Sequence, residues 1–371
     1  MVRRIISIEA LAQVLAAKKE IVDVKPQDTI NHALKLMHAN SIRTLPVKDS
    51  DGNYHRTISV AELLCFLLRA IAMVKLLPHT SQQDARIFLT RGALASPVQE
   101  ALARQPDPQV DRDDVFLTLM INSSEIQIEE LTDYIFRGVK RVIVQVDGCK
   151  KLFTQTDICR HLLSLSVSSP KSALAKLFGM SLHDLRHRAR ESDTLRDTFL
   201  PGKYPVLSIP SDAPLLEAIE LLVSSAVDAV PVLDFPGAAE WTEYINPEVA
   251  GPYSTFSVSD LRCLVQENAL ELLEPSATVK SFLLLTKQGA SRKLVTCDGL
   301  DKLGEVVDRM LTAGIHRVWF CDADGTVEGV LSFTDILRLV IDQLQDVSDW
   351  SELTISDADE DENLESEESN K

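Results

Sequence analysis

The chain has 371 residues, of which 45% are hydrophobic, 25% charged and 5% aromatic, a balance typical of globular proteins. Its formal net charge of −17 opposes general binding to nucleic-acid phosphates or anionic membrane surfaces. No run of about 18 apolar residues is present, so we expect no membrane-spanning helix. The first residues lack the apolar centre and cleavage site of a secretory signal.

The six cysteines are scattered and include no C-x-x-C pair, which argues against a disulfide framework or a zinc module. Reduced thiols are typical of the cytoplasm or the nucleus, and we expect the protein in one or both. From Asp346 to Glu368 there are eleven acidic residues and no Lys or Arg. Because this stretch repels itself and has little apolar surface to bury, we predict a disordered acidic tail over 346–371.

In chain order, four segments carry apolar residues at the helical spacing i, i+3, i+4, i+7. A short β-branched run follows each segment, then an acidic turn and a second apolar strand, which together predict a hairpin. Internal repetition of this kind is typical of repeat architectures. The helical segments are Ile30/Ala33/Leu34/Met37, the weaker Ile128/Leu131/Thr132/Ile135, Leu215/Ala218/Ile219/Leu222 and Leu303/Val306/Val307/Met310.

A second helix then opens with Ser or Thr three residues before an acid. The interval from the first strand to this motif is 17 residues in copies one and four, 15 in copy two and 30 in copy three, where a Pro/Gly-bearing insert accounts for the excess. The four openings, called the signatures below, are SVAE at Ser59, TQTD at Thr154, SVSD at Ser257 and SFTD at Ser332.

The unit is therefore strand–helix–strand–strand–helix, an α/β arrangement with helices on one face of a short sheet. One unit is small for independent stability, so we expect the copies to pair. The expected segments are repeat 1 at 10–75, a diverged repeat 2 at 93–167, a linker-helix region at 170–200, repeat 3 at 201–270 with an insert at 236–252, and repeat 4 at 276–345.

The repeated unit resembles the cystathionine-β-synthase (CBS) domain. The resemblance is strongest in two stretches, DAPLLEAIELLVSSAVDAVPVLD and DKLGEVVDRMLTAGIHRVWFCDADGTVEGVLSFTDILRLV. Four copies in one chain resemble the γ-type regulatory subunit of AMP-activated and sucrose-non-fermenting protein kinases. The resemblance covers residues 10–345 and implies four CBS repeats paired into two modules of a flat disc.

The signatures support two interpretations. Ser or Thr followed three residues later by an acid is a helix-capping pattern worth about 1 kcal/mol. The resemblance adds a second role, in which the acid accepts hydrogen bonds from the ribose hydroxyls of an adenine nucleotide and the hydroxyl residues hold its base. By position these residues are Ser59, Glu62, Thr154, Asp157, Ser257, Asp260, Ser332, Thr334 and Asp335. Glu62 is one methylene longer than the family's Asp, which puts that site in doubt.

Phosphates need positive charge, which an acidic chain must concentrate locally. The start of the second strand carries it in three copies: Arg43, Lys140 with Arg141, and His316 with Arg317. The resemblance implies that these side chains grip nucleotide phosphates. Copy three has Asp228 at this place, which opposes phosphate binding.

We find no P-loop, no G-x-G-x-x-G motif, no nucleophile elbow and no protein-kinase signature set. His183 and His187 lie four residues apart without a third ligand nearby, so we expect no metal site. The repeats leave too little chain for a catalytic domain, and we expect no enzymatic activity.

We therefore expect a non-catalytic γ-type regulatory subunit that senses AMP, ADP or ATP and partners a catalytic kinase subunit and a β-type scaffold subunit. The alternative is a CBS-repeat scaffold that no longer senses nucleotide. Glu62, Asp228 and the divergence of copy two favour that alternative.

Overall fold

The structure, a computed structural model, describes residues 13–75, 82–103, 117–119, 135, 139–146, 149–191, 206–233, 254–264, 274, 276–286, 294–323, 325 and 327–343. The expected insert at 236–252 and the acidic tail lie outside these residues. So does all but Ile135 of the weak helical segment of repeat 2. The chain divides into two compact units, and each combines repeats that are not consecutive in sequence.

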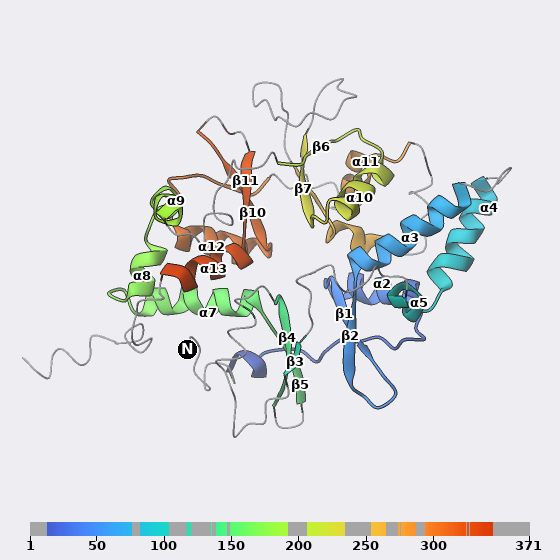
Figure 1. Ribbon diagram of the computed structural model, residues 1–371, viewed down its shortest axis with the longest axis horizontal. Coiled ribbons are helices and arrows are strands. Elements are labelled where there is room, and N and C mark those ends of the chain that lie inside the picture. The colour runs from blue at the N-terminus through green and yellow to red at the C-terminus, as the bar shows by residue number, and fades with distance from the viewer. Residues whose placement is uncertain are drawn as a thin grey trace, which may run out of the picture. The chain divides into compact units, whose positions relative to one another are not determined.

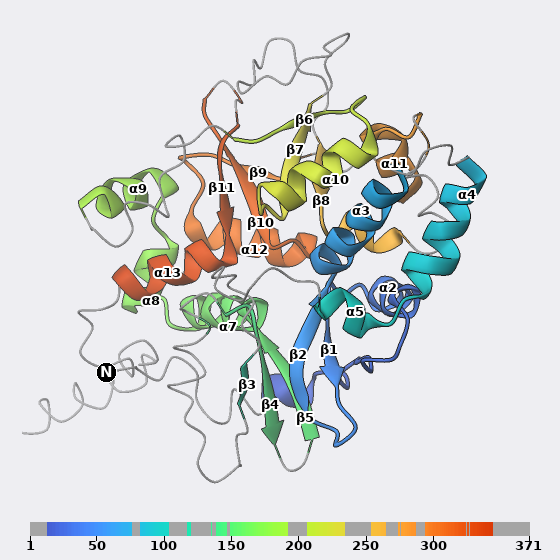
Figure 2. The same ribbon diagram turned by 45° about the vertical axis from the view of Figure 1, so that its right-hand side comes forward.

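The 1/3 unit holds repeats 1 and 3 and comprises 22–112 and 205–294. Repeat 1 and the segment after it form α2 (Ile30–Ala39), β1 (Thr44–Lys48), β2 (Tyr54–Ser59), α3 (Val60–Lys75), α4 (Gln82–Ile87), the π-helix η1 (Phe88–Gly92), the 3-10 helix η2 (Ala93–Ala95) and α5 (Val98–Ala103). The last two helices lie in the stretch predicted to begin repeat 2 at 93, yet they belong to the 1/3 unit. Repeat 3 and the segment after it form β6 (Ile209–Pro210), α10 (Leu215–Ser224), β7 (Ala229–Leu233), β8 (Ser254–Ser257), the 3-10 helix η3 (Asp260–Cys263) and α11 (Val279–Thr286). Helix α11 lies in the stretch predicted to begin repeat 4 at 276, yet it belongs to the 1/3 unit. In this unit α10 packs against α3 (Figure 2).

The 2/4 unit holds repeats 2 and 4 and comprises 1–21, 113–204 and 295–371. Repeat 2 and the segment after it form β3 (Leu117–Leu119), β4 (Arg141–Val146), β5 (Cys149–Thr154), α7 (Gln155–Ser168), α8 (Ala173–Phe178) and α9 (Leu182–Glu191). Repeat 4 forms β9 (Thr296–Cys297), α12 (Leu303–Ala313), β10 (Arg317–Cys321), β11 (Val327–Ser332) and α13 (Phe333–Gln343). Helix α7 packs against α8, α12 and α13 (Figure 1).

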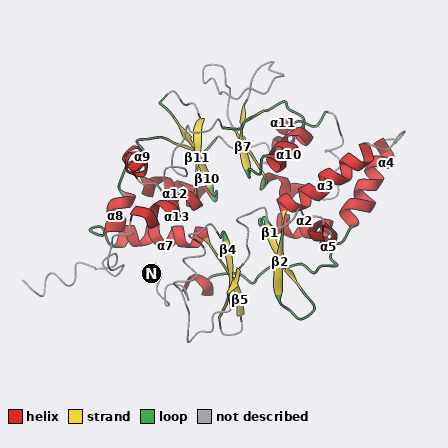
Figure 3. Ribbon diagram, viewed as in Figure 1, coloured by secondary structure: helices red, strands yellow, loops and turns green. Residues whose placement is uncertain are grey.

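Each of the four repeats builds its own small sheet, and the strand pattern is the same in all four. Helices lie beside each hairpin (Figure 3). A first strand pairs in parallel with the hairpin: β3 with β4, β6 with β7, β9 with β10, and Val24 with Val47 through a single bridge. The expected α/β fold class is therefore confirmed. The first strand of repeat 2, which the sequence left unplaced, is β3.

Apolar side chains at equivalent positions of the hairpins form the cores. In three of the predicted helices the buried residues are those that set the helical spacing: α2, α10 and α12. The facing pairs across the hairpins are Leu45 with Ile58, Val142 with Phe153, Val230 with Phe256, and Val318 with Leu331. All eight are buried, at 5% exposure or less.

Three of the repeats need a left-handed residue where the first helix ends and the strand begins. Gly314 has φ 62° at the end of α12, where glycine carries no steric cost. Ser41 and Ala226 have φ 55° and 53° at the equivalent places in repeats 1 and 3. The 1/3 unit thus holds two side-chain-bearing residues in a conformation that costs about 1 kcal/mol each.

Two predicted helices differ from expectation. The described part of the region 170–200, which runs to residue 191, contains two helices, because Gly179 ends α8 and the hydroxyl of Ser181 accepts from the Asp184 N–H to begin α9 (3.1 Å). Between Ser257 and residue 264, where this described stretch stops, the chain forms η3, a 3-10 helix of four residues. There the carboxylate of Asp260 turns back onto Ser257 and closes one tight turn.

Candidate functional site

The hairpin register places each signature directly opposite the start of the preceding strand. The opposed residues are Thr44 with Ser59, Arg141 with Thr154, Ala229 with Ser257, and Arg317 with Ser332. The backbone N–H of the second residue of each signature donates to the backbone carbonyl of the residue just before the opposing strand. These hydrogen bonds run from Val60 to Arg43, Gln155 to Lys140, Val258 to Asp228, and Phe333 to His316. The backbone therefore brings the predicted hydroxyl, carboxylate and phosphate-binding positions together in repeats 1, 2 and 4, and it places Asp228 at the equivalent position in repeat 3.

In all four signatures the acid folds back onto the first residue; in repeats 1, 2 and 4 this caps the start of a helix, whereas in repeat 3 η3 begins at Asp260 itself without a side-chain cap. The signature acid accepts the backbone N–H of the signature's first residue, at 2.5 Å for Ser59 to Glu62, 2.9 Å for Thr154 to Asp157, 2.9 Å for Ser257 to Asp260 and 2.8 Å for Ser332 to Asp335. In repeats 2, 3 and 4 the hydroxyl also donates to the same carboxylate oxygen. This contact thus occupies one carboxylate oxygen, and the second oxygen decides whether a ligand can bind.

The second oxygen of Asp335 is available in repeat 4. Within the described residues, Oδ1 of Asp335 has no hydrogen-bond donor, whereas Oδ2 accepts from the Ser332 hydroxyl at 2.6 Å. Burial raises the pKa of Asp335, while the bonds from Ser332 and the charges of Arg338 and Arg317 oppose this rise. A ligand that donates hydroxyls to Oδ1 would stabilise the ionised form of this carboxylate.

The second oxygen of Asp157 is engaged in repeat 2. Oδ1 lies 2.6 Å from Nζ of Lys18, and Arg160 approaches the same atom at 3.9 Å. The Asp157 side chain is only 2% exposed. Sequence reasoning placed Asp157 in a ligand site but missed Lys18, which lies far away in the chain and outside the repeat.

The two units differ in the charges beside their signatures. In the 2/4 unit these positions carry Lys140, Arg141, His316 and Arg317. In the 1/3 unit Arg43 instead pairs with Asp228 of the other repeat, with Nη1 and Oδ2 3.7 Å apart. The predicted phosphate residue Arg43 is thus partnered by the acid that the sequence identified as unfavourable.

The signatures of repeats 2 and 4 contact one another inside the 2/4 unit. The Thr334 hydroxyl donates to Oε1 of Gln155 at 3.1 Å, and the Thr156 hydroxyl lies 3.5 Å from Nδ1 of His316. The His316 ring also packs edge-on against Phe333, with centroids 5.9 Å apart. Gln155 and Thr156 were not predicted as site residues. They are the second and third residues of TQTD, and they align with Phe333 and Thr334 in SFTD. Because Thr334 is a predicted site residue, this alignment could have predicted Thr156 as well.

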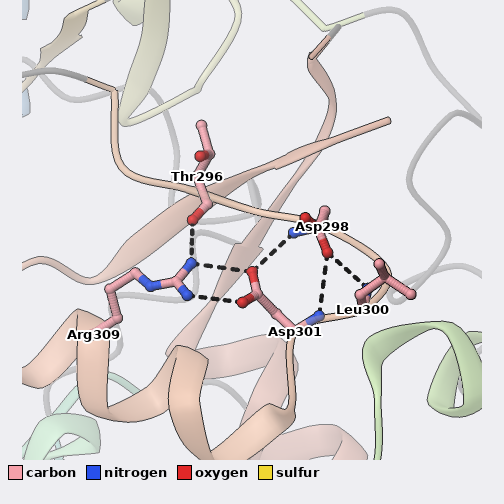
Figure 4. A network of polar contacts seen from close by, with 5 residues as sticks. All are labelled: Thr296, Asp298, Leu300, Asp301 and Arg309. Carbon is pink, nitrogen blue, oxygen red and sulfur yellow. Dashed lines mark hydrogen bonds and ion pairs between the residues drawn. The ribbon is translucent and has the colours of Figure 1, made fainter. Parts of the chain in front are cut away.

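An ion-pair network in repeat 4 lies apart from the signature and orders the loop before α12 (Figure 4). Nη2 of Arg309 lies 2.8 Å from Oδ1 of Asp301, and Nη1 donates to the Thr296 carbonyl. The hydrogen bond from Arg309 holds the pKa of Asp301 below its ordinary value. The start of α9 docks on this loop, because the Leu182 N–H donates to the Asp301 carbonyl at 2.9 Å.

Within the described ranges, no cluster of three or more His, Cys, Asp or Glu side chains is arranged to hold a metal ion. His183 and His187 lie edge to face on α9 with ring centroids 4.6 Å apart. No described helix is long and apolar enough to cross a bilayer.

Comparisons with known proteins agree with this geometry. The CBS domain family matches residues 11–69, 202–237 and 290–342, which lie in repeats 1, 3 and 4. The SNF1-related protein kinase regulatory subunit gamma-like PV42b of Arabidopsis thaliana is 25% identical over 347 residues, which cover 87% of this chain and 92% of that protein. The human 5′-AMP-activated protein kinase subunit gamma-3 is 30% identical over 148 residues, or 40% of this chain and 27% of that one.

A solved structure shows the same fold. The crystal structure of an archaeal protein from Methanocaldococcus jannaschii, described as a homologue of the AMPK γ subunit, superposes with a TM-score of 0.56 at 16% identity. The match covers 89% of this chain and 99% of that one. Repeat 2 lies outside the family matches but shares the hairpin register of the others. The chain is thus a CBS-repeat protein that resembles the γ regulatory subunits of AMP-activated and SNF1-related protein kinases.

Proposed function

We propose that this protein is a non-catalytic regulatory subunit that binds an adenine nucleotide (AMP, ADP or ATP) at the signature of repeat 4. One observation carries the proposal: the 2/4 unit combines a carboxylate with an open oxygen, Oδ1 of Asp335, with basic residues at the strand starts of both repeats. The carboxylate accepts ribose hydroxyls, and Arg317 with its basic neighbours attracts the phosphates.

The partners follow from the resemblance. The relatives are named as regulatory γ subunits of protein kinases, so we propose a catalytic kinase subunit and a β-type scaffold subunit as partners, in the cytoplasm or the nucleus. Exchange of AMP for ATP would change contacts to the basic residues, and this differential contact is what a sensor of cellular energy requires.

Calorimetric titration of the full chain with AMP, ADP and ATP tests the nucleotide site. We expect saturable binding that Asp335→Ala weakens at least tenfold. Asp260→Ala removes the equivalent acid from the 1/3 unit and is the matched control, for which we expect a smaller change. Equal binding by the parent and Asp335→Ala, with both proteins folded, would contradict the assignment.

A specific observation favours a second candidate, the scaffold that does not sense nucleotide. The Arg43–Asp228 pair leaves the 1/3 unit with balanced charge beside its signatures. If every adenylate fails to bind, and the kinase partner is retained equally with or without nucleotide in a pull-down, the scaffold is the correct function.

A further inference from the structure

The start of the stretch predicted as repeat 1 (10–75) packs in the 2/4 unit up to residue 21, although the rest of repeat 1 lies in the 1/3 unit. Residues 13–16 form a helical turn, and Leu15 is 4% exposed within the core of repeats 2 and 4. Val14 packs at the edge of the same core. The segment is therefore anchored by apolar contacts beside repeat 2.

These contacts hold Lys18 beside the signature of repeat 2, where both its side chain and its backbone carbonyl are engaged. Its ammonium lies 2.6 Å from Oδ1 of Asp157, at the start of α7. Its backbone carbonyl accepts a hydrogen bond from Nζ of Lys151, on β5, at 2.9 Å. Lys18 thus contacts both elements that position this signature.

The contact with Lys18 engages the carboxylate oxygen of Asp157 that a ligand would need as an acceptor. Oδ2 of Asp157 already accepts the N–H and the hydroxyl of Thr154, at 2.9 and 2.7 Å. With Oδ1 held by the ammonium, neither oxygen remains for the hydroxyls of an incoming ribose. In repeat 4 the equivalent Oδ1, on Asp335, has no donor within the described residues.

We infer that Lys18 occupies the repeat-2 site and excludes an adenine nucleotide until its ammonium withdraws from Asp157. The inference rests on the proposed function only in naming adenylate as the competing ligand. The Lys18 side chain is 29% exposed and sits on a flexible four-carbon stem, so the ammonium can withdraw into water without unfolding a core element.

The first test measures binding stoichiometry on the full chain at pH 7.5 with AMP and ATP. Lys18→Met keeps the aliphatic stem and removes the charge, and we expect it to bind one more equivalent per chain than the parent. The double variant Lys18→Met/Asp157→Ala should lose that added equivalent. Lys19→Met, which removes the exposed neighbouring charge, is the matched control and should bind as the parent does.

The second test uses the unmodified protein and does not depend on the folding of a variant. Acylation by an amine-reactive reagent, followed by peptide mass spectrometry, should modify Lys18 at least tenfold more slowly than Lys19. Equal rates would overturn the inference, as would a folded Lys18→Met variant with unchanged stoichiometry.

The outcomes separate this inference from the proposed function. If the parent binds no adenylate but Lys18→Met binds one equivalent that Asp157→Ala removes, the repeat-4 site is wrong and the inference stands. If the parent binds through Asp335 and Lys18→Met binds no more, the inference is wrong and the proposed function stands.

Discussion

The 1/3 unit and the 2/4 unit share the same hairpin register and the same fold-back of the signature acid, yet the charges beside the signatures differ. In the 1/3 unit Arg43 faces Asp228, and the positions opposite the signature hydroxyls are Thr44 and Ala229. In the 2/4 unit those two positions are both arginine, Arg141 and Arg317.

This difference separates two roles that a signature can play. Capping needs only the acid and the first residue of the signature, and all four repeats retain both. Anion binding also needs positive charge across the strand, and only the 2/4 unit concentrates it. The local hydrogen bonds of a signature therefore do not by themselves indicate a ligand site.

The largest expected effect tests whether the 1/3 unit and the 2/4 unit unfold independently of each other. Phe153 and Phe256 occupy equivalent, fully buried positions in the 2/4 and 1/3 units. Replacing either by Ala should lower the free energy of unfolding by about 3–5 kcal/mol, because it removes a large buried ring and leaves a cavity. Differential scanning calorimetry should show two unfolding transitions, and each variant should lower the temperature of only one of them. A single transition that both variants shift equally would break the comparison.

Next in size is the contribution of charge to nucleotide binding. Arg317→Ala should weaken adenylate binding roughly 10- to 100-fold, the usual effect of losing a charge-assisted hydrogen bond. Arg43→Ala, its counterpart in the 1/3 unit, should weaken binding by less than about threefold because Asp228 already partners that arginine. Isothermal calorimetry of both variants measures the ratio, and equal losses would show that the units do not differ.

A smaller effect appears in the pH dependence of the 2/4 unit. Burial raises the pKa of Asp335 in the folded chain, so ionising it costs stability; the cost is absent below its ordinary pKa of about 4 and complete above the raised pKa. Asp335→Asn keeps a capping side chain and removes this cost. The Tm of this variant minus that of the parent should therefore increase as pH rises from 4 to 7.

Asp301 supplies the control of opposite sign for that measurement. Arg309 lowers the pKa of Asp301, so its contribution to stability is present above the ordinary pKa of about 4 and is lost as pH falls through the lowered value. Asp301→Asn should therefore be less stable than the parent at pH 7, and the gap should close in acid. Parallel pH curves for the two variants would contradict both assignments.

The smallest effect concerns the left-handed residues before the strands. Ala226→Gly should stabilise the 1/3 unit by about 0.5–1 kcal/mol, and Gly314→Ala should destabilise the 2/4 unit by a similar amount. A Cβ at Gly314 would meet no atom within 4 Å, so the cost there is purely conformational. Chemical denaturation of each variant measures the two changes, which should have opposite signs.

Local patterns in the sequence predicted the repeats well. The spacing of Ile30, Ala33, Leu34 and Met37 is the buried face of α2, and the acid three residues into each signature does return to accept the N–H of the signature's first residue. These features depend on residues within a few positions of one another, so periodicity and spacing suffice to predict them.

The sequence could not predict which repeats pair, nor the contacts that this pairing creates. Lys18 meets Asp157 across 139 positions of chain, and Arg43 meets Asp228 across 185. No periodic pattern encodes such separations, and either lysine or arginine alone is indistinguishable from a solvated charge. These two contacts nevertheless engage two of the candidate site residues, Asp157 and Arg43, with side chains that the repeat pattern does not predict.

The interleaving of repeats has a consequence for how the protein is made. Because the chain alternates between the units, a ribosome that has completed repeat 2 has produced half of each unit and the whole of neither. The 1/3 unit can close once α11 has emerged, whereas the 2/4 unit must wait for α13. Until then the nascent chain exposes apolar faces that have no partner yet, and a premature stop between repeats 3 and 4 would leave a fragment with one finished unit and one permanently open core.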